Sequence, residues 1–195
     1  MTLIAKNHFA LNRTDYTKGL LSGRYKNKWR PELDARPITP TEDKLSEFQE
    51  KMEKWGWPDQ DRYNDGSLPA KLLNHETTMF ELMDDTVSET DPIGYSFITA
   101  PSASVKERFW GAAHYPVIEI ENLGLFPDNE GGGRGKAYFE MMFDQYFKRY
   151  ETVYWSQHET HSPTLKKFYL EKIGMKLLAT DYVPDFRSKQ NPKVA

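Results

Sequence analysis

Glycine and basic residues crowd into one short stretch, residues 125–136, which reads LFPDNEGGGRGK. The glycines at 131–133 and Gly135 would let a backbone approach a ligand closely, and unpaired N–H groups at a helix start can hold a phosphate. Arg134 and Lys136 would add positive charge. We therefore expect a phosphate-binding loop here, and the alternative is a glycine-rich connector without a ligand.

Two common phosphate motifs do not fit this loop. Glu130 stands where a Walker A loop needs its first glycine, and Ala137 is neither Ser nor Thr. Lys136 occupies the third glycine position of a GxGxxG motif. The loop therefore belongs to a different strand-loop-helix pattern.

Two carboxylates, Glu119 and Glu121, interrupt the apolar run that precedes the loop. Residues two apart on a strand project from the same face unless a bulge intervenes. Carboxylates are costly to bury on a central strand, and burial would raise a pKa toward the range of a general base. Glu119 and Glu121 are therefore both candidates for a general base; the alternative is two acids on a partly solvated face.

Metal and thiol chemistry find little support in the sequence. His158 and His161 stand close together, but their spacing is a poor helical pair and no third ligand is evident. The chain has no cysteine, which excludes disulfides, a cysteine nucleophile and thiolate metal sites. We predict no metal.

The elements around the loop follow from apolar periodicity. Residues 117–126 are rich in β-branched and leucine side chains and predict a buried central strand. A helix is predicted from Gly135 to Tyr150, with Glu140 on its polar face. Its apolar face would carry Phe139, Met142, Phe143, Tyr146, Phe147 and Tyr150.

Other segments complete an alternation of strands and helices. A capping pattern at Thr39 and Pro40 predicts a helix whose apolar face carries Leu45, Phe48, Met52 and Trp55, and Ser162 with Pro163 predicts another that ends at Gly174. Residues 102–116 are ambiguous, although Phe109 and Trp110 should pack over the sheet. The further strands are expected at 35–38, 77–83, 93–100, 152–155 and 175–179.

Two of these segments resemble motifs of one family. Residues 125–135 resemble the acetyl-CoA loop of the GCN5-related N-acetyltransferases (GNATs), with Glu130 in place of the usual Gln or Arg. Residues 162–176, SPTLKKFYLEKIGMK, resemble the last helix of that family, where Tyr169 and Gly174 match and Ser162 replaces an Asn. The resemblance covers roughly residues 33–184.

The resemblance implies an α/β (α+β-like) GNAT fold, a mixed and mostly antiparallel sheet flanked by helices. It also implies transfer of an acetyl group from acetyl-CoA to a primary amine by direct attack, with Glu119 as base and Tyr169 as general acid toward the CoA sulfur. The N–H of Leu123 would meet the acetyl carbonyl. The cofactor-binding set would be Leu123, Leu125, Phe126, Gly131, Gly132, Gly133, Arg134, Gly135, Lys136 and Ser162.

Length and charge set the remaining expectations. The 195 residues suit one domain at 33–184, with a basic extension at 1–32 and a tail at 185–195. The net charge of −3 argues against a general nucleic-acid binder, yet residues 1–36 carry eight lysines and arginines against three acids. Without an apolar span or an export signal, we expect no membrane partner and a cytoplasmic location.

The resemblance implies an amine acceptor, small molecule or peptide, bound partly by the segment after the first helix, and the acidic and aromatic residues at 57–69 would suit a cationic amine. Two alternatives stay open. One is a non-catalytic acyl-CoA-binding or interaction module that keeps the fold, and the other is a nucleic-acid-associated protein that uses the basic N-terminal segment.

Overall fold

A computed structural model describes residues 3–26, 30–55, 66–158 and 163–184. Seven strands form one sheet in the order β2-β3-β4-β5-β6-β1-β7, and its described neighbours are antiparallel except for the parallel pair β5 and β6. The predicted mixed, mostly antiparallel α/β architecture is confirmed. The strands are β1 (Leu3–Asn12), β2 (Leu33–Ile38), β3 (Thr77–Asp84), β4 (Gly94–Thr99), β5 (Val117–Leu125), β6 (Thr152–His158) and β7 (Lys176–Pro184).

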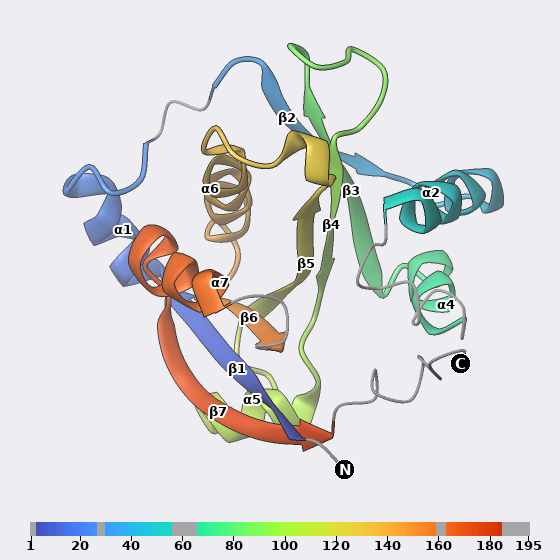
Figure 1. The fold of residues 1–195 in the computed structure, drawn as a ribbon. Coiled ribbons are helices and arrows are strands. Elements are labelled where there is room, and N and C mark those ends of the chain that lie inside the picture. Colours follow the sequence, from blue (N-terminus) through green and yellow to red (C-terminus); the bar gives the residue numbers. More distant parts are fainter. Residues whose placement is uncertain (1–2, 27–29, 56–65, 159–162, 185–195) are drawn as a thin grey trace, which may run out of the picture.

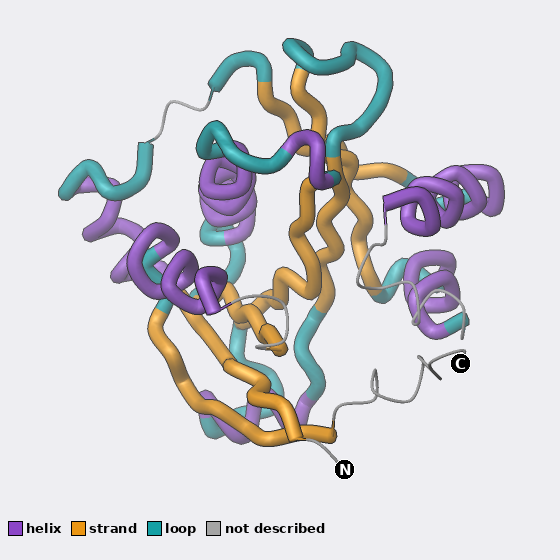
Figure 2. Tube along the Cα trace, viewed as in Figure 1, coloured by secondary structure: helices purple, strands orange, loops and turns teal. Residues whose placement is uncertain are grey.

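Helices cover both faces of the sheet (Figure 1, Figure 2). One face carries α1 (Arg13–Leu21), α6 (Arg134–Tyr146) and α7 (Pro163–Lys167), which continues as the π-helical turn η3 (Phe168–Ile173). The other face carries α2 (Glu42–Trp55), α4 (Ser67–Leu73) and α5 (Ala103–Trp110). A short 3-10 turn, η1 (Pro127–Asn129), links β5 to the glycine loop. Within the described residues, no helix combines the length and apolar character needed to cross a bilayer.

Each face has its own apolar core. The core under α6 and η3 includes Phe9, Ile120 and Phe143, whereas the core under α2 and α4 includes Phe48 and Phe97. The predicted buried positions of α2 that the structure describes, Leu45, Phe48 and Met52, are all buried. The two cores fix the sheet from both sides, so strand residues alternate between them.

Helix α6 confirms the predicted apolar face and corrects one polar position. Phe139, Met142 and Phe143 are buried as expected. Glu140, predicted on the solvent face, is only 6% exposed, because its carboxylate pairs with Lys136 and accepts a hydrogen bond from the Lys26 amide at 3.1 Å. The α-helix ends at Tyr146, one turn before the predicted end.

One helix start differs from the sequence prediction, and one segment that the sequence left ambiguous is a helix. The first turn of α2 is held by Thr41 rather than Thr39, since the Thr41 carbonyl accepts from Leu45 N at 2.9 Å. Residues 103–110, left unassigned above, form α5, which Ser102 caps and Gly111 ends at a φ of 72°. Phe109 and Trp110 pack over the sheet as predicted, with ring centroids 6.1 and 5.9 Å from that of Tyr154.

The expected N-terminal extension is corrected by strand β1. Residues 3–12 pair antiparallel with β6 on one side and with β7 on the other, so this strand lies inside the sheet (Figure 1). Phe9 and Leu11 are 0% and 2% exposed. The strand escaped detection because Asn7 and His8, both polar, are buried beside the apolar positions and hide the alternation. The predicted tail at 185–195 lies outside the described residues.

Candidate active site

The site begins where two neighbouring strands separate. The parallel pairing of β5 with β6 ends at Glu119 and Tyr154, although both strands continue. On its other side β5 stays paired with β4 up to Leu125. Gly94 permits that close approach, since a Cβ there would lie 2.2 Å from the Gly124 carbonyl oxygen. The backbone of β5 beyond Glu119 therefore faces a widening gap in the sheet.

A bulge in β5 lies at the same point. Phe97 pairs with Asn122 and Ile98 with Ile120, so Glu121 is the extra residue. The bulge turns β5 as it leaves β6 and re-aims the Glu121 side chain. The sequence prediction allowed for such a bulge without locating it.

A cavity of about 500 Å³ opens on the α4–α5 side of this separation. Its walls include Glu119 and Glu121 of β5, Tyr154 and Ser156 of β6, and Val105 of α5. The two carboxylates were predicted to share a face, and both line the cavity. Tyr154 and Ser156 were not anticipated, because nothing in the spacing of a short apolar strand sets them apart from core residues.

The charges around the cavity are mainly acidic. Three carboxylates, Glu76, Glu119 and Glu121, face two cations, Lys6 and Lys71. The Lys71 Nζ lies 3.8 Å from a Glu121 carboxylate oxygen. Excess negative charge in a concave site favours a cationic ligand.

The glycine loop takes a backbone path that requires glycine. Gly131, Gly132 and Gly133 have φ values of 92°, 59° and 77°, a region that other residues adopt only at a cost. Gly133 is the residue before α6, and around both Gly131 and Gly133 the space a Cβ would enter is open. The side chain of Glu130 is exposed, which keeps its charge out of the protein interior. The loop thus offers accessible backbone at a helix N-terminus.

The two basic side chains of the loop, Arg134 and Lys136, each form an ion pair with a carboxylate. Arg134 Nε donates to Asp84 Oδ2 at 2.6 Å, and Asp84 is fully buried. Burial alone would raise the pKa of Asp84, but hydrogen bonds from Thr86 and Arg134 hold it below its ordinary value. Lys136 pairs with Glu140 and donates to the Arg24 carbonyl at 3.0 Å. A role of Arg134 and Lys136 toward a phosphate stays a prediction.

Arg30 is a cation at the loop that the sequence did not reveal. Its Nη1 donates to the Gly132 carbonyl at 2.9 Å, and its Nε pairs with Glu32 at 2.5 Å. The space beside Gly132 is bounded by Nη1 of Arg134 and Nη1 of Arg30, 3.5 and 3.9 Å from a Cβ placed there. Two guanidinium groups therefore converge on the exposed turn of the loop.

The strand positions predicted to contact the cofactor differ in whether the backbone N–H already has a hydrogen-bond partner. Leu123 and Leu125 are half-buried against the core under α6. The Phe126 amide donates to the Ile93 carbonyl at 2.9 Å, and its own carbonyl accepts from Asn129. The Phe126 N–H is thus already committed, and its contribution would be limited to its side chain. That side chain is buried in the core under α2.

Tyr169, the predicted general acid, lies in the π-helical turn η3. It is 5% exposed and packs against Trp155, Phe9 and Phe139, with ring centroids 5.3, 5.4 and 5.9 Å away. Burial raises its pKa well above the ordinary value, so the phenol is protonated at neutral pH. It lies on the face opposite the cavity of Glu119, so the structure places the two groups on either side of the sheet. Ser162 lies outside the described residues, and Gly135 faces Phe168 beside Tyr169.

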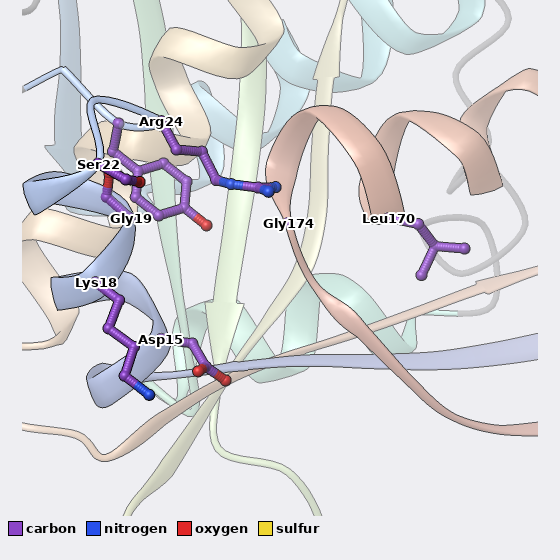
Figure 3. A pocket seen from close by; sticks show the side chains of 8 residues that line it. Asp15, Lys18, Gly19, Ser22, Arg24, Leu170 and Gly174 are labelled. Atoms are coloured by element: carbon purple, nitrogen blue, oxygen red, sulfur yellow. The ribbon is translucent and has the colours of Figure 1, made fainter.

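A second cavity, of about 390 Å³, lies between α1 and η3 (Figure 3). Its lining includes Asp15, Lys18, Arg24, Leu170 and Gly174. The Arg24 guanidinium donates to the Glu171 carbonyl at 3.3 Å and so joins the N-terminal segment to η3. None of the predicted site residues lines this cavity, whereas Glu119 and Glu121 both line the cavity at β5 and β6.

Comparison with solved structures finds this arrangement of strands and helices in acetyltransferases. A GCN5-related N-acetyltransferase from Sphaerobacter thermophilus matches with a TM-score of 0.55 at 15% identity, over 94% of this chain and 51% of that chain. A ribosomal-protein-alanine N-acetyltransferase from Brucella melitensis biovar Abortus 2308 matches with a TM-score of 0.53 at 14% identity, over 79% of this chain and 99% of that chain. The chain has the GNAT fold.

The GNAT fold is established here by structure. No protein-family model and no curated protein matches the sequence. The chain spans 60% of a functionally unknown protein from Staphylococcus epidermidis and 55% of a tandem GNAT protein from the clavulanic acid biosynthesis pathway, with TM-scores of 0.56 and 0.53 and identities of 13% and 12%. These two matches include 93% and 95% of the residues of this chain. The chain therefore spans about half to three fifths of several of the GNAT-like structures it matches.

Proposed function

We propose that this GNAT-fold protein is an N-acetyltransferase that moves an acetyl group from acetyl-CoA to a primary amine by direct attack. The observation that carries the proposal is the position of the acidic cavity. It lies where β5 and β6 separate, so a group held in the gap between the strands would be within reach of an amine held by Glu119 and Glu121. Proximity of this kind supplies much of the rate of an acyl transfer.

The donor side is the glycine loop with the start of α6. Gly131–Gly133 expose backbone at a helix N-terminus, and the guanidinium of Arg30 adds charge at Gly132. These groups fit a pyrophosphate, which is doubly charged and binds best to several N–H donors at once. The N–H of Leu123, on the part of β5 that has left β6, would support the acetyl carbonyl.

The acceptor side is the cavity, and its chemistry suits an amine. An amine enters near neutral pH as an ammonium ion, which the carboxylates of Glu119 and Glu121 attract. Glu119 would take a proton from the nitrogen so that its electron pair can attack the carbonyl carbon. Tyr169, on the other face, would give its proton to the sulfur as the C–S bond breaks; burial raises its pKa, so the phenol is protonated beforehand.

One observation favours the alternative, a non-catalytic acyl-CoA-binding or interaction module. Arg134 and Lys136 are held by Asp84 and Glu140, so two of the expected phosphate contacts come with a competing partner. Such a module would bind acetyl-CoA without releasing CoA when amines are present.

The test is turnover on an amine panel of spermidine, phenylethylamine and a dipeptide with a free α-amine. Mass spectrometry of the acetylated amine and release of free CoA are measured together. We expect at least one panel amine to be acetylated, and Glu119→Gln to lower kcat/KM for it by roughly a hundredfold or more, the usual size of a general-base effect.

The matched control is Glu89→Gln, which removes an exposed carboxylate of the loop between β3 and β4 that does not line the cavity. It should keep the wild-type rate. Binding of acetyl-CoA with no acetylation of any panel amine would support the interaction module instead. A Glu119→Gln rate equal to the wild-type rate would reject the assigned base while leaving the enzyme class intact.

A further inference from the structure

A line of hydrogen-bonded side chains runs from the acidic cavity to the far edge of the sheet. The ring of His8, on β1, lies between Tyr154 of β6 and Asp181 of β7. His8 Nδ1 is 2.5 Å from the Tyr154 Oη, and His8 Nε2 is 3.0 Å from Asp181 Oδ2. The register of β1 with its two neighbours puts all three side chains on one face, diagonally across adjacent strands. That face is the one on which the cavity opens.

Chemistry fixes the direction of these hydrogen bonds. Arg108 of α5 donates hydrogen bonds to both carboxylate oxygens of Asp181, at 2.6 and 2.7 Å, and holds the pKa of Asp181 well below its usual range. An ionised carboxylate only accepts, so His8 Nε2 carries a hydrogen and donates it. If His8 is neutral, Nδ1 is then its free acceptor, and the Tyr154 hydroxyl donates to it.

The charges that face His8 favour its neutral form. Burial lowers its pKa, and Lys6 on its own strand and Arg108 on α5 act in the same direction. Asp181 on β7 opposes them, and Tyr154 on β6 is a protonated phenol because burial and the nearby charge of Glu119 raise its pKa. A neutral imidazole with a free Nδ1 can take a proton.

This line starts in the wall of the cavity and ends at the protein surface, and its first two members, Tyr154 and His8, are both buried, with Tyr154 2% exposed. Tyr154 lines the acidic cavity next to Glu119, its partner in the strand register. His8 is 4% exposed and lies under Phe109, with ring centroids 5.2 Å apart. The Asp181 side chain is 34% exposed at the other end. A proton could thus pass from cavity to surface without water entering between the strands.

We propose that Tyr154, His8 and Asp181 form a proton relay that carries one proton of the acceptor amine out of the cavity. The inference rests on the proposed acetyl transfer and deepens it. Tyr154 is the member that faces the amine; His8 and Asp181 act through it. None of the three was a predicted site residue, and His8 and Asp181 belong to β1 and β7, the last two strands at one end of the sheet.

The reaction needs such a second proton acceptor. An ammonium ion has three N–H bonds and the amide product has one, so two protons leave the nitrogen. Glu119 takes one of them. For the other, an N–H bond breaks as the Tyr154 O–H forms, and the original Tyr154 O–H breaks as His8 Nδ1–H forms. The nitrogen keeps its electron pair and bonds to the carbonyl carbon, and the C–S electron pair leaves with sulfur. The imidazolium is stabilised by Asp181, and its Nε2–H then breaks as the proton passes to Asp181 Oδ2 and from this partly exposed carboxylate to water.

The kinetic test uses the full chain, acetyl-CoA and whichever panel amine the wild type acetylates best. Tyr154→Phe and His8→Gln should each lower kcat/KM by roughly tenfold to a hundredfold, because each removes one proton carrier and keeps the shape. The matched controls are Tyr115→Phe and His114→Gln. Tyr115 also contacts Trp110, and His114 is exposed on the loop after α5. Both should stay within about twofold of wild type.

The pH profile separates a relay from a packing role. The wild-type rate should fall in acid as His8 becomes charged, at a pKa below 6.5. Asp181→Asn removes the charge that raises this pKa, so the acid limb should move to lower pH. Arg108→Gln removes a charge that lowers it, so the limb should move to higher pH, each by about half a unit or more. Two limbs that stay in place, or that move in the same direction, would overturn the relay.

An activity-independent measurement separates this inference from the proposed function. Imidazole ¹⁵N NMR of the ligand-free protein should show His8 protonated at Nε2, with the Nδ1 signal shifted in Tyr154→Phe. If the wild type acetylates panel amines but Tyr154→Phe and His8→Gln keep its rate, the relay alone is overturned. If the wild type acetylates none of them, the proposed function and the catalytic use of the relay fail together, even where the NMR tautomer is as expected.

Discussion

Arg30 shows how a single side chain can serve the glycine loop from outside the motif. Its guanidinium reaches across from the segment before β2 and holds the Gly132 carbonyl, which orients the peptide units on either side. The neighbouring Arg134 is turned toward Asp84, so Arg30 is the half-exposed cation at this turn of the loop. Charge-assisted hydrogen bonds of this kind are worth more than neutral ones.

Arg30→Ala should weaken acetyl-CoA binding about tenfold, the effect of losing one charge-assisted contact. Calorimetric titration of the two proteins with acetyl-CoA measures it. The control is Arg36→Ala, because Arg36 is similarly exposed and also pairs with a carboxylate two residues away, Asp34. Equal weakening in both variants would assign the effect to general charge rather than to the loop.

At the residue scale, sequence spacing identified candidate residues that stand out within one strand and missed candidates that are brought together only by contacts between strands. Glu119 and Glu121 stand out in sequence because acids on an apolar strand are costly, and both line the cavity. His8 is 146 residues from Tyr154 and 173 residues from Asp181 in the sequence, so only the pairing of three strands brings them together. The roles of Leu123, Tyr169 and the loop residues toward acetyl-CoA stay predictions.

Strand β1 is the element on which both the fold and the relay depend. It fills the position between β6 and β7, supplies Phe9 and Leu11 to one core, and turns His8 toward the cavity face. A strand with a paired neighbour on each side holds both neighbours in register through two ladders of backbone hydrogen bonds. The N-terminal segment is therefore a structural part of the site.

Leu11→Ala should lower the free energy of unfolding by about 2–5 kcal/mol, the range for a buried leucine. The same substitution at Leu3 is the control, since Leu3 is 54% exposed on the same strand while Leu11 is 2% exposed. Leu3→Ala should change stability by less than about 0.5 kcal/mol. Chemical denaturation followed by circular dichroism compares them, and equal losses would contradict the interior position of β1.

Elements with strong periodicity could be predicted, and those without it could not. The strand from Val117 and the helix after the glycines are confirmed because the apolar spacing changes from strand-like to helical across the loop. The burial of Glu140 depends on Lys136 and on the chain segment at Lys26, which no local pattern contains. The late start of α2 reflects a choice between two threonines, since either threonine can cap a helix and the Thr41 hydroxyl accepts from the Lys44 amide at 3.3 Å.

At the scale of the whole molecule, the sheet divides the work between its faces. The glycine loop, α6 and Tyr169 lie with one core, while the acidic cavity and the relay lie on the other side. The separation of β5 from β6 is the passage that joins them. In the proposed acetyl transfer, donor and acceptor groups would therefore come from opposite faces of the sheet and from distant parts of the chain.

The most direct measurement is calorimetric titration of the purified protein with acetyl-CoA, with ATP and NADH as controls. The account predicts micromolar binding of acetyl-CoA and none of the controls, because the glycine loop, Leu123 and the gap between β5 and β6 together fit a thioester on a long arm. Absence of acetyl-CoA binding at millimolar concentration, or equal binding of ATP, would contradict it and would leave a protein that has the acetyltransferase fold without its donor site.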